Sequence, residues 1–260
     1  MSTAAVLVTH NSARWIAETF LSVLHQGNAV DRIVIVDDHS EDNTLNIIRE
    51  HAQGVSVEIV QSASQSKDVH TRIASNFVQG VEQAQAEFVF LGDHDDLWHA
   101  HRVSSQLKAL IDHPHAALLA SDGRIVNESA GATGKTLRDV FPVPVGFANW
   151  RTSQQFGYVV RHSVATGGAC AIRPAAFHDL KVPAGWLHDR WWSLWATAHN
   201  VLVVDPTIVI DYRVSDAQQV GLDAAFQDEG APAWLMHHAG QLMRSTRRAI
   251  DLVPLFIESR

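Results

Sequence analysis

Three acidic residues follow an apolar run near the middle of the chain. The run Glu87–Leu91 leads into Asp93, Asp95 and Asp96. Carboxylates held this close repel one another, so a fold that keeps them together normally supplies a cation or hydrogen-bond donors. Oxygen ligands of this kind suit Mg²⁺ or Mn²⁺, which in turn bind diphosphates. A solvated turn is the alternative, but ligand sites in α/β sheets lie at the carboxyl ends of strands, and that position favours a metal–diphosphate site.

Short apolar runs alternate with helical patterns over the first half of the chain. Strands are predicted at Ala4–Val8, Arg32–Val36, Val55–Val60, Glu87–Leu91 and Ala116–Ala120, with helices at about 43–51 and 102–111 among those between them. This alternation indicates βα units. The predicted fold class is therefore α/β, with a Rossmann-like, mainly parallel, doubly wound sheet flanked by helices. Such an architecture binds nucleotides.

The pattern becomes less regular after Asp122. Glycine and proline residues over 127–150 predict a long loop or lid. Further elements are predicted as a strand within Val164–Ile172, a short helix at Pro174–Leu180, a helix at Trp191–His199, strands at Val201–Val204 and Thr207–Tyr212, and a helical tail from Pro232 to Ile257. No segment has the composition of a linker, so residues 1–260 are expected to form a single domain.

The composition excludes several classes of protein. A formal net charge of −8 argues against a general binder of nucleic acid or anionic membranes. The single cysteine, Cys170, excludes an intrachain disulfide framework and a cysteine-rich zinc site. The sixteen histidines include no His-Glu-x-x-His pair, so no zinc site is expected. The chain lacks a basic leader and an apolar run of about eighteen residues, and a soluble cytoplasmic protein without a transmembrane segment is expected.

A second acidic segment follows the strand predicted at Arg32–Val36. Residues 40–43 suit the start of the next helix, because serine, aspartate and asparagine are good capping residues. Asp37 and Asp38 lie too early to cap that helix. One of them could accept hydrogen bonds from the base or ribose of a nucleotide, and the residues alone leave that ligand role as open as a structural one.

The first predicted strand ends in residues 9–12, Thr-His-Asn-Ser. These side chains could present hydrogen-bond donors to a nucleotide or cap the helix that follows, and capping is slightly favoured. Gly131–Thr136 matches a phosphate-binding P-loop only in part, since Ser129 stands where the motif needs its first glycine. The Gly-x-Gly-x-x-Gly fingerprint is absent, so a nicotinamide or flavin enzyme is not expected.

Trp186–Trp192 combines an acid and a histidine with three indole rings. In one interpretation Asp189 stands at the start of a helix and the tryptophans pack in the core. In the other, Asp189 is a general base in a pocket walled by aromatic rings that stack on sugars. The residues alone do not decide between these two.

In their order along the chain, these segments resemble glycosyltransferase family 2, the nucleotide-sugar transferases of GT-A fold. The motifs that carry the resemblance are Val6–Asn11, Ile33–Ser40 with Asp42 and Thr44, Phe90–Trp98, Thr166–Gly168 with Ala171–Arg173, His188–Asp189, and Tyr212–Arg213 with Gly221. Phe90–Trp98 is similar to the Asp-x-Asp metal motif, especially that of rhamnosyltransferase-like members. The resemblance implies a nucleotide-sugar-binding half to about residue 122, an acceptor and catalytic half to about 221, and a helical tail over 222–260.

The resemblance also implies a role for each matching residue. Binding of the nucleotide-sugar donor is implied for Thr9, Asn11, Asp37, Asp38, Asp93 and Arg213, and binding of the acceptor for Thr166, Gly167, Gly168, His188, Trp191 and Trp192. Asp95 is implied as the direct ligand of Mn²⁺ or Mg²⁺, with Asp93 as the other member of the metal pair, nearer the ribose. Asp189 is implied as the general base, in a single displacement that inverts the anomeric carbon.

Two features separate this chain from many of the proteins it resembles. Ser215 stands where they have a histidine, and the Gln-x-x-Arg-Trp motif of processive synthases is missing. The expected function is transfer of a single sugar from a nucleotide-diphosphate sugar to a glycan or lipid-linked acceptor. A dTDP-rhamnose donor and peripheral contact of the basic tail with the inner face of a membrane are further expectations. The alternatives are a nucleotide-sugar-binding module without turnover and a P-loop phosphotransferase that uses Lys135.

Overall fold

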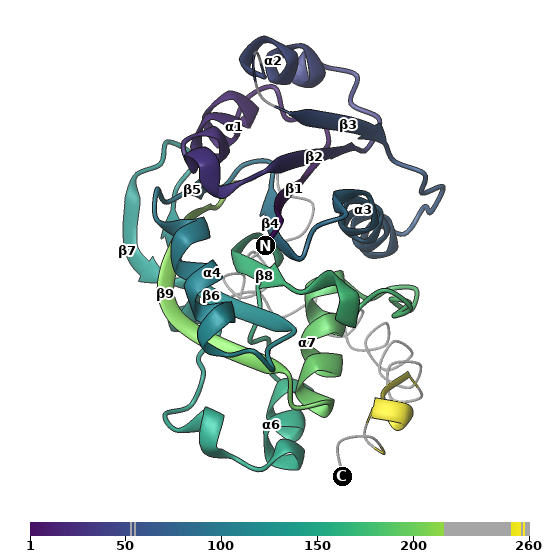
Figure 1. The fold of residues 1–260 in the computed structure, drawn as a ribbon, viewed down its shortest axis with the longest axis vertical. Coiled ribbons are helices and arrows are strands. Elements are labelled where there is room, and N and C mark those ends of the chain that lie inside the picture. The colour runs from purple at the N-terminus through teal and green to yellow at the C-terminus, as the bar shows by residue number, and fades with distance from the viewer. Residues whose placement is uncertain (53, 55, 216–250, 256, 258–260) are drawn as a thin grey trace, which may run out of the picture.

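The computed structural model describes residues 1–52, 54, 56–215, 251–255 and 257. Within these residues the strands form one sheet in the order β3-β2-β1-β4-β8-β6-β9-β5, and β7 pairs with β6 outside this path. The strands are β1 Thr3–Thr9, β2 Arg32–Asp37, β3 Val57–Gln61, β4 Phe88–Asp93, β5 Leu97–Trp98, β6 Leu118–Val126, β7 Ala132–Thr136, β8 Cys170–Ile172 and β9 Leu202–Arg213. Helices cover both faces of this sheet (Figure 1).

The α-helices are α1 Ile16–Leu24, α2 Thr44–His51, α3 Val69–Ala84, α4 Arg102–Asp112, α5 Leu137–Val140, α6 Thr152–Val159 and α7 His188–Ala198. Four short 3-10 turns lie between them: η1 Gly27–Ala29, η2 Phe147–Asn149, η3 Gly167–Ala169 and η4 Pro174–Ala176. Asp68 caps α3 by accepting a hydrogen bond from the Thr71 amide. Thr136 and Asp139 form a capping box at the start of α5.

The alternation of side chains along β1 explains why helices lie on both faces. Ala4, Val6 and Val8 face one hydrophobic cluster, which holds Phe77 of α3 and residues of α6 and α7. Ala5 and Leu7 face the other, which α1, α2 and α4 complete. Successive residues of a strand point to opposite faces, so a strand buried on both sides is apolar throughout. This confirms the predicted α/β class and the doubly wound architecture.

The sheet is parallel in its first half and mixed in its second. β1 pairs in parallel with β2 and β4, and β2 with β3. β8 then runs antiparallel to β4 and β6, whereas β6 and β9 are parallel. Because β8 is antiparallel to β4, the turn η3 at its amino end lies at the carboxyl end of β4. That reversal brings a segment from the second half of the chain to the edge at which the acidic residues lie.

Several predicted boundaries were wrong in the second half. The strand predicted at Ala116–Ala120 is β6, which continues to Val126 because Ile125 and Val126 are buried beyond the polar residues in between. The two strands predicted between 201 and 212 are one strand, β9, with a register shift opposite β6. Residues 127–150 are not one loop: they contain β7, α5 and η2. β7 has exposed polar residues and no apolar alternation, so only its pairing with β6 defines it.

Other predicted elements were displaced or shortened. Helix α7 begins at His188 rather than Trp191. The strand predicted within Val164–Ile172 is limited to Cys170–Ile172, and the helix predicted at Pro174–Leu180 is the three-residue turn η4. The helical tail predicted from Pro232 falls mostly outside the described residues. In the part of the tail that the structure describes, residues 251–255 are helical. None of the helices in the described part of the chain is long and apolar enough to cross a membrane.

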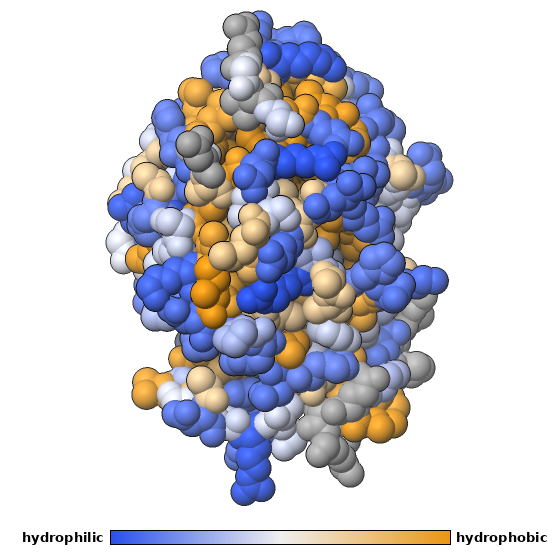
Figure 2. Space-filling view, viewed as in Figure 1, coloured by the Kyte–Doolittle hydropathy of each residue, from blue (hydrophilic) through white to orange (hydrophobic). Residues whose placement is uncertain are grey.

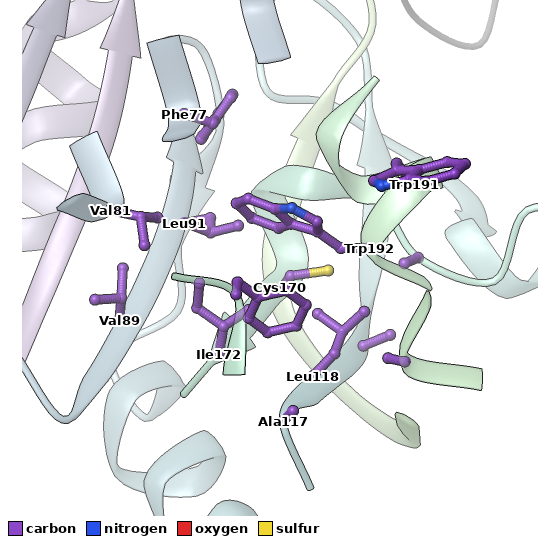
Figure 3. Packing of buried hydrophobic residues seen from close by; sticks show 14 of the residues in the cluster. Phe77, Val81, Val89, Leu91, Ala117, Leu118, Cys170, Ile172, Trp191 and Trp192 are labelled. Atoms are coloured by element: carbon purple, nitrogen blue, oxygen red, sulfur yellow. The ribbon is translucent and has the colours of Figure 1, made fainter. Parts of the chain in front are cut away.

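Hydrophobic residues form the core, and hydrophilic residues cover much of the visible surface (Figure 2). Figure 2 shows hydrophilic side chains spread over the visible face between smaller apolar areas. Figure 3 shows Trp192 extending from α7 toward Leu91 and Phe77, with Cys170, Ile172 and Leu118 close by. This packing joins α7 to α3 and to the centre of the sheet.

Candidate active site

The acidic residues singled out by sequence lie at one edge of the sheet. In the parallel register Thr9 is opposite Asp37, and Val8 is opposite Asp93. Three neighbouring strands therefore end together, and each ends in or next to a polar residue. Ligands in α/β folds bind in the crevice outside such carboxyl ends.

Asp93 and Asp96 converge on Gly168. A Cβ atom built on Gly168 would lie 2.5 Å from Oδ2 of Asp96 and 2.8 Å from Oδ2 of Asp93. The antiparallel register of β4 and β8, Val89 opposite Ile172 and Phe90 opposite Ala171, carried further along both strands, sets Asp93 opposite Gly168. A residue with a side chain would occupy the space in which the two carboxylates meet. Asp95, between them in sequence, is also buried.

Burial raises the pKa of Asp93 and of Asp96. The pKa of Asp93 rises to about 7, chiefly because its carboxyl group is removed from solvent, although part of the residue's surface remains accessible. Repulsion from Asp95 and Asp189 adds to this increase, whereas Arg102 and a hydrogen bond from the Gly168 amide oppose it. The pKa of Asp96 is raised well above its usual value, first by burial and then by Asp95 and Asp93. Oδ2 of Asp96 is buried without a hydrogen-bond partner.

A buried arginine lies beneath this cluster. Arg102 is fully buried, and burial lowers the pKa of its guanidinium to about 9 even though Asp96 and Asp93 oppose the change. Its Nη2 donates to the carbonyl of Leu91 at 2.6 Å, and its guanidinium carbon lies 3.7 Å from the centre of the Trp98 ring. Sequence reasoning missed Arg102. The signal that could have identified it is its position beside Val103 on the buried face of α4.

Asp189 lies across the glycine turn from Asp93. It stands in the first turn of α7, and its Oδ2 accepts a hydrogen bond from the Gly167 amide at 2.9 Å. Its Oδ1 accepts from the amide of Arg190 at 2.6 Å. The two amides of the turn therefore serve two carboxylates, since Gly167 donates to Asp189 and Gly168 to Asp93. One short turn fixes the relative positions of both acids.

His188 packs directly behind this turn. Its ring stacks on Phe77 with centroids 3.9 Å apart, and a Cβ atom on Gly167 would lie 2.8 Å from its Nε2. Both ring nitrogens are buried without hydrogen-bond partners. Burial lowers the pKa of His188 to about 4, against the attraction of Asp189, so the imidazole is neutral at neutral pH.

The two tryptophans of α7 lie in the hydrophobic core. Trp192 is 1% exposed and packs on Phe177, whereas Trp191 is 6% exposed and packs on Trp186. Their placement favours the packing interpretation in this conformation, and acceptor contact by Trp191 and Trp192 stays a prediction. Thr166 precedes η3 and accepts the amide hydrogen bond of Ala169.

The residues predicted to hold the nucleotide form a network of their own. Asp37 accepts hydrogen bonds from the Thr9 hydroxyl at 2.9 Å and from the amide and hydroxyl of Ser40. Asn11 accepts from the Glu41 amide at 2.8 Å, while its own amide donates to Ser40. These bonds join the segment after β1 to the segment after β2. Neither Thr9 nor Asn11 caps α1, whose N-cap residue makes no side-chain cap bond.

Asp38 is paired with an arginine that sequence reasoning missed. Nε of Arg72 lies 2.7 Å from Oδ2 of Asp38, which is 5% exposed. Arg72 is on the first turns of α3, and the neighbouring Thr71 hydroxyl accepts a hydrogen bond from the Gly185 amide. A cation therefore stands at the same edge as the acids. Only the packing of α3 against β1 and β2 brings Arg72 there.

The remaining predicted residues lie nearby or outside the described chain. Arg213 ends β9 and is 1% exposed, with its guanidinium bonded within the protein, so its contact with a phosphate stays a prediction. Ser215 is buried and Gly221 is outside the described residues. The partial P-loop Gly131–Thr136 lies on the antiparallel strand β7, which does not support a phosphate-wrapping loop there. Among the described residues no group of three or more His, Cys, Asp or Glu side chains has the arrangement of a metal site.

A family model identifies the chain. The model described as glycosyl transferase family 2 matches residues 4–180, which is more than half of the sequence. The chain belongs to this family. The match includes the acidic cluster and η3 but ends before Asp189.

Curated relatives are similar over parts of their length. A protein of Bacillus subtilis (strain 168), EpsE, whose assignment as a glycosyltransferase is provisional, is 23% identical over 68% of this chain and 58% of its own. The dTDP-rhamnosyl transferase RfbG of Shigella flexneri is 27% identical over 40% of this chain and 37% of its own. The poly(ribitol-phosphate) beta-N-acetylglucosaminyltransferase TarP of Staphylococcus aureus (strain N315) is 32% identical over 37% and 29%. The matches therefore span between 29% and 58% of these family members.

Solved structures share the fold. TarS of S. aureus, in complex with UDP-GlcNAc, has a TM-score of 0.61 at 19% identity, covering 89% of this chain and 62% of that one. The mannosyltransferase PcManGT of Pyrobaculum calidifontis, in complex with GDP-Man and Mn²⁺, has a TM-score of 0.59 at 17% identity, covering 98% and 68%. The fold of this family member is therefore the GT-A fold expected from the sequence.

Replacing Gly168 by alanine should destabilise the protein. The added Cβ would meet the carboxylates of Asp96 and Asp93 at less than contact distance, so the buried acids must move. Overpacking of this kind costs about 1–3 kcal/mol. The expected loss is measured as the free energy of unfolding in urea. Gly157→Ala is the matched control, since no atom lies within 4 Å of its added Cβ. Equal stability of the two variants would contradict the convergence of the acids on Gly168.

His188 should make the fold sensitive to mild acid. Its pKa in the folded state is about 4 against an ordinary 6.5. Above pH 6.5 neither state binds this proton, and below it the unfolded chain does while the folded protein does not. Stability is therefore lost as the pH falls from 6.5 to about 4, with a loss on the order of 2 kcal/mol between pH 7 and pH 5.

The measurement for His188 compares unfolding free energies at pH 7 and pH 5. His188→Gln should lose about 2 kcal/mol less than the native protein over this interval, whatever its stability at pH 7. His25→Gln, which removes an exposed histidine, is the control. An unchanged pH dependence in His188→Gln would mean that the imidazole binds its proton in the folded state.

Proposed function

We propose that this chain is a metal-dependent, inverting glycosyltransferase. It moves a single sugar from a nucleotide-diphosphate sugar to a hydroxyl group of a glycan or lipid-linked acceptor. One observation carries the proposal: the amides of Gly167 and Gly168 hold Asp189 on one side and Asp93 of the acidic cluster on the other. A carboxylate that can accept a proton, that of Asp189, therefore lies next to a cluster of carboxylates suited to a cation. Membership of the family supports this assignment of roles.

The donor nucleotide is assigned to the edge formed by β1, β2 and β4. In this proposal Thr9, Asn11, Asp37 and Asp38 define the base and ribose site, and Asp93 lies nearer the diphosphate end. Because the Thr9 and Asp37 side chains bond to each other, part of their contribution is to shape the loops that surround the base. The pairing of Asp38 with Arg72 supports a more direct role for Asp38, since a ligand hydroxyl can share that ion pair.

The acidic cluster fits a divalent cation. Oδ2 of Asp96 is buried without a hydrogen-bond partner, and the pKa of Asp93 is raised to about 7, first by burial and then by repulsion from Asp95 and Asp189. A cation beside these carboxylates would offset both costs. Mg²⁺ in such sites is commonly held by one or two carboxylates together with substrate phosphates, so three protein ligands are not required. Asp95 and Asp93 would hold Mn²⁺ or Mg²⁺. The ion would neutralise charge that develops on the departing diphosphate.

Asp189 is the proposed general base. It receives two hydrogen bonds from backbone amides, which orient the carboxylate and leave it as an acceptor of the proton of a hydroxyl group. The neutral His188 beside it adds no positive charge that would hold the carboxylate in an ion pair. A base separate from the donor site fits a single displacement, in which the acceptor oxygen attacks the anomeric carbon as the bond to the diphosphate breaks.

The acceptor is proposed to lie over η3 and the start of α7. Thr166, Gly167, Gly168 and His188 border Asp189 there, whereas Trp191 and Trp192 would reach an acceptor only after a change in packing. The similar proteins have names that include transfer of rhamnose from dTDP and of N-acetylglucosamine to poly(ribitol phosphate). Transfer of a sugar from a nucleotide-diphosphate donor is in keeping with the first name, and the proposal extends it to a glycan or lipid-linked acceptor at the inner face of a membrane.

The first test is a thermal-shift panel of UDP, dTDP, GDP, CDP and ATP, each with Mn²⁺ and with EDTA. At about one hundred times its dissociation constant a ligand stabilises the folded state by roughly 2.7 kcal/mol. We expect one diphosphate to stabilise the protein more with Mn²⁺ than with EDTA, and this difference to vanish in Asp95→Ala. Asp179→Ala, which removes an exposed acid, is the control. No shift with any nucleotide would contradict the site, and a shift with ATP alone would support a phosphotransferase.

The second test is Asp189→Asn. It should leave the metal-dependent nucleotide shift intact and lower sugar transfer by about 10²–10⁴-fold, the usual contribution of a general base. Transfer and donor hydrolysis are measured by release of nucleoside diphosphate, with Asp179→Asn as the control. Turnover close to that of the native protein would remove Asp189 from this role. Nucleotide binding without any turnover in the native protein would favour a binding module.

A further inference from the structure

Arg213 is fixed by acceptors from three separate segments. Its Nε donates to the carbonyl of Asp95 at 2.9 Å, its Nη1 to the carbonyl of Glu128, and its Nη2 to the carboxylate of Glu18 at 3.0 Å. The residue is 1% exposed. A planar guanidinium whose donors point in three directions is held in one orientation by such contacts.

An aromatic ring completes the arrangement. The guanidinium carbon of Arg213 lies 4.4 Å from the centre of the Trp15 ring, and that of Arg14 lies 4.1 Å from the same centre. Nη2 of Arg14 also pairs with the Glu128 carboxylate at 2.8 Å. Glu128 therefore contacts both arginines, through its side chain and its carbonyl. We name Arg14, Trp15, Glu18, Glu128 and Arg213 the arginine clasp.

The clasp holds the acidic segment through main-chain and side-chain contacts. Besides the bond from Nε to Asp95, the amide of Arg213 donates to Oδ1 of Asp96 at 3.1 Å. The segment between β4 and β5 has no ladder hydrogen bonds of its own, so its buried carbonyls need other partners. Arg213 supplies one to Asp95. The position of the acids thus depends on residues far away in sequence, at 14–18 and at 128.

We propose that Arg213 is a positioning residue for Asp95 and Asp96 and does not bind the donor phosphates. The inference rests on the proposed function only for what those acids do. Three of the five guanidinium N–H groups already bond to protein acceptors and the residue is 1% exposed, so a phosphate would reach the guanidinium only if the clasp opened. Lysine cannot replace it, because one ammonium group cannot reach the two carbonyls and the carboxylate in the same geometry. The clasp also connects the donor site to Glu18 and Arg14, which are exposed at the surface.

The test compares the native protein with Arg213→Lys, Arg213→Gln and Glu18→Ala. Arg124→Gln is the matched control, since Arg124 is an arginine on the neighbouring strand that pairs with Asp211 of β9. Hydrogen exchange of backbone amides is followed without ligand. The Arg213 variants should raise exchange by about tenfold at residues 94–96, at 128 and at 213, as expected when a hydrogen bond to a charged group is lost. Arg124→Gln should leave these residues unchanged.

The second readout is affinity for UDP and for dTDP, each with Mn²⁺ and with EDTA. A positioning residue acts through Asp95, so Arg213→Lys should weaken the metal-dependent affinity about tenfold and leave the affinity in EDTA unchanged. Equal weakening with and without Mn²⁺, together with unchanged exchange at 94–96, would show that Arg213 binds phosphate and would overturn the proposal. The exchange readout needs no nucleotide, so failure of the native protein to bind either one counts against the proposed function alone.

Glu18→Ala keeps the proposal testable if the Arg213 variants do not fold. Glu18 is 60% exposed at its side chain, so its truncation leaves the core intact. It removes the acceptor of Nη2 and should raise exchange at residues 94–96, by less than the Arg213 variants do. If amide exchange at residues 94–96 is the same in Glu18→Ala as in the native protein, the clasp does not hold the acidic segment.

Discussion

The structure depends on keeping like charges close together at the end of β4. Asp93 and Asp96 converge over Gly168, and Asp189 is near enough to raise the pKa of Asp93. Buried carboxylates that repel one another are tolerated only where donors and opposite charges are fixed in place. Backbone amides of η3 and the guanidinium of Arg102 meet that need in part. The proposed cation would offset the remaining cost of burial and repulsion.

Arginines fix the loops around this cluster through backbone carbonyls. In irregular segments Arg138 donates to Val164, Arg190 to Val160 and His162, and Arg213 to Asp95 and Glu128. Arg102 and Arg138 also donate to carbonyls of β4 and β6. Carbonyls in irregular segments have no ladder partner, and a buried carbonyl without one is costly. The guanidinium group reaches several of them at once. Segments without regular structure are thereby bonded to the elements that carry these arginines.

The sequence was sufficient to predict features whose signal is local. It was insufficient to predict features that depend on the packing of distant segments. Apolar periodicity predicted β1, β2, β4 and the α/β class, and the acidic spacing singled out Asp93, Asp95 and Asp96. The exposed strand β7 has no apolar alternation, so its pairing with β6 could not be read from its own residues. Arg72 and Arg102 were missed for a similar reason, because an arginine that contacts an acid or a carbonyl has no pattern until helices α3 and α4 are in place.

The reversal of chain direction between β4 and β8 explains why the two halves of the chain make one site. In a wholly parallel sheet the strand after β4 would bring its own carboxyl end, and a following loop, to this edge. β8 is antiparallel and brings its amino end instead, so the turn that precedes it meets Asp93 directly. Both positions of the turn must lack a side chain, since Gly168 faces two carboxylates and Gly167 faces the ring of His188. Neither glycine is needed for its backbone conformation. Both are needed because the acids and the imidazole occupy the space that a side chain would fill.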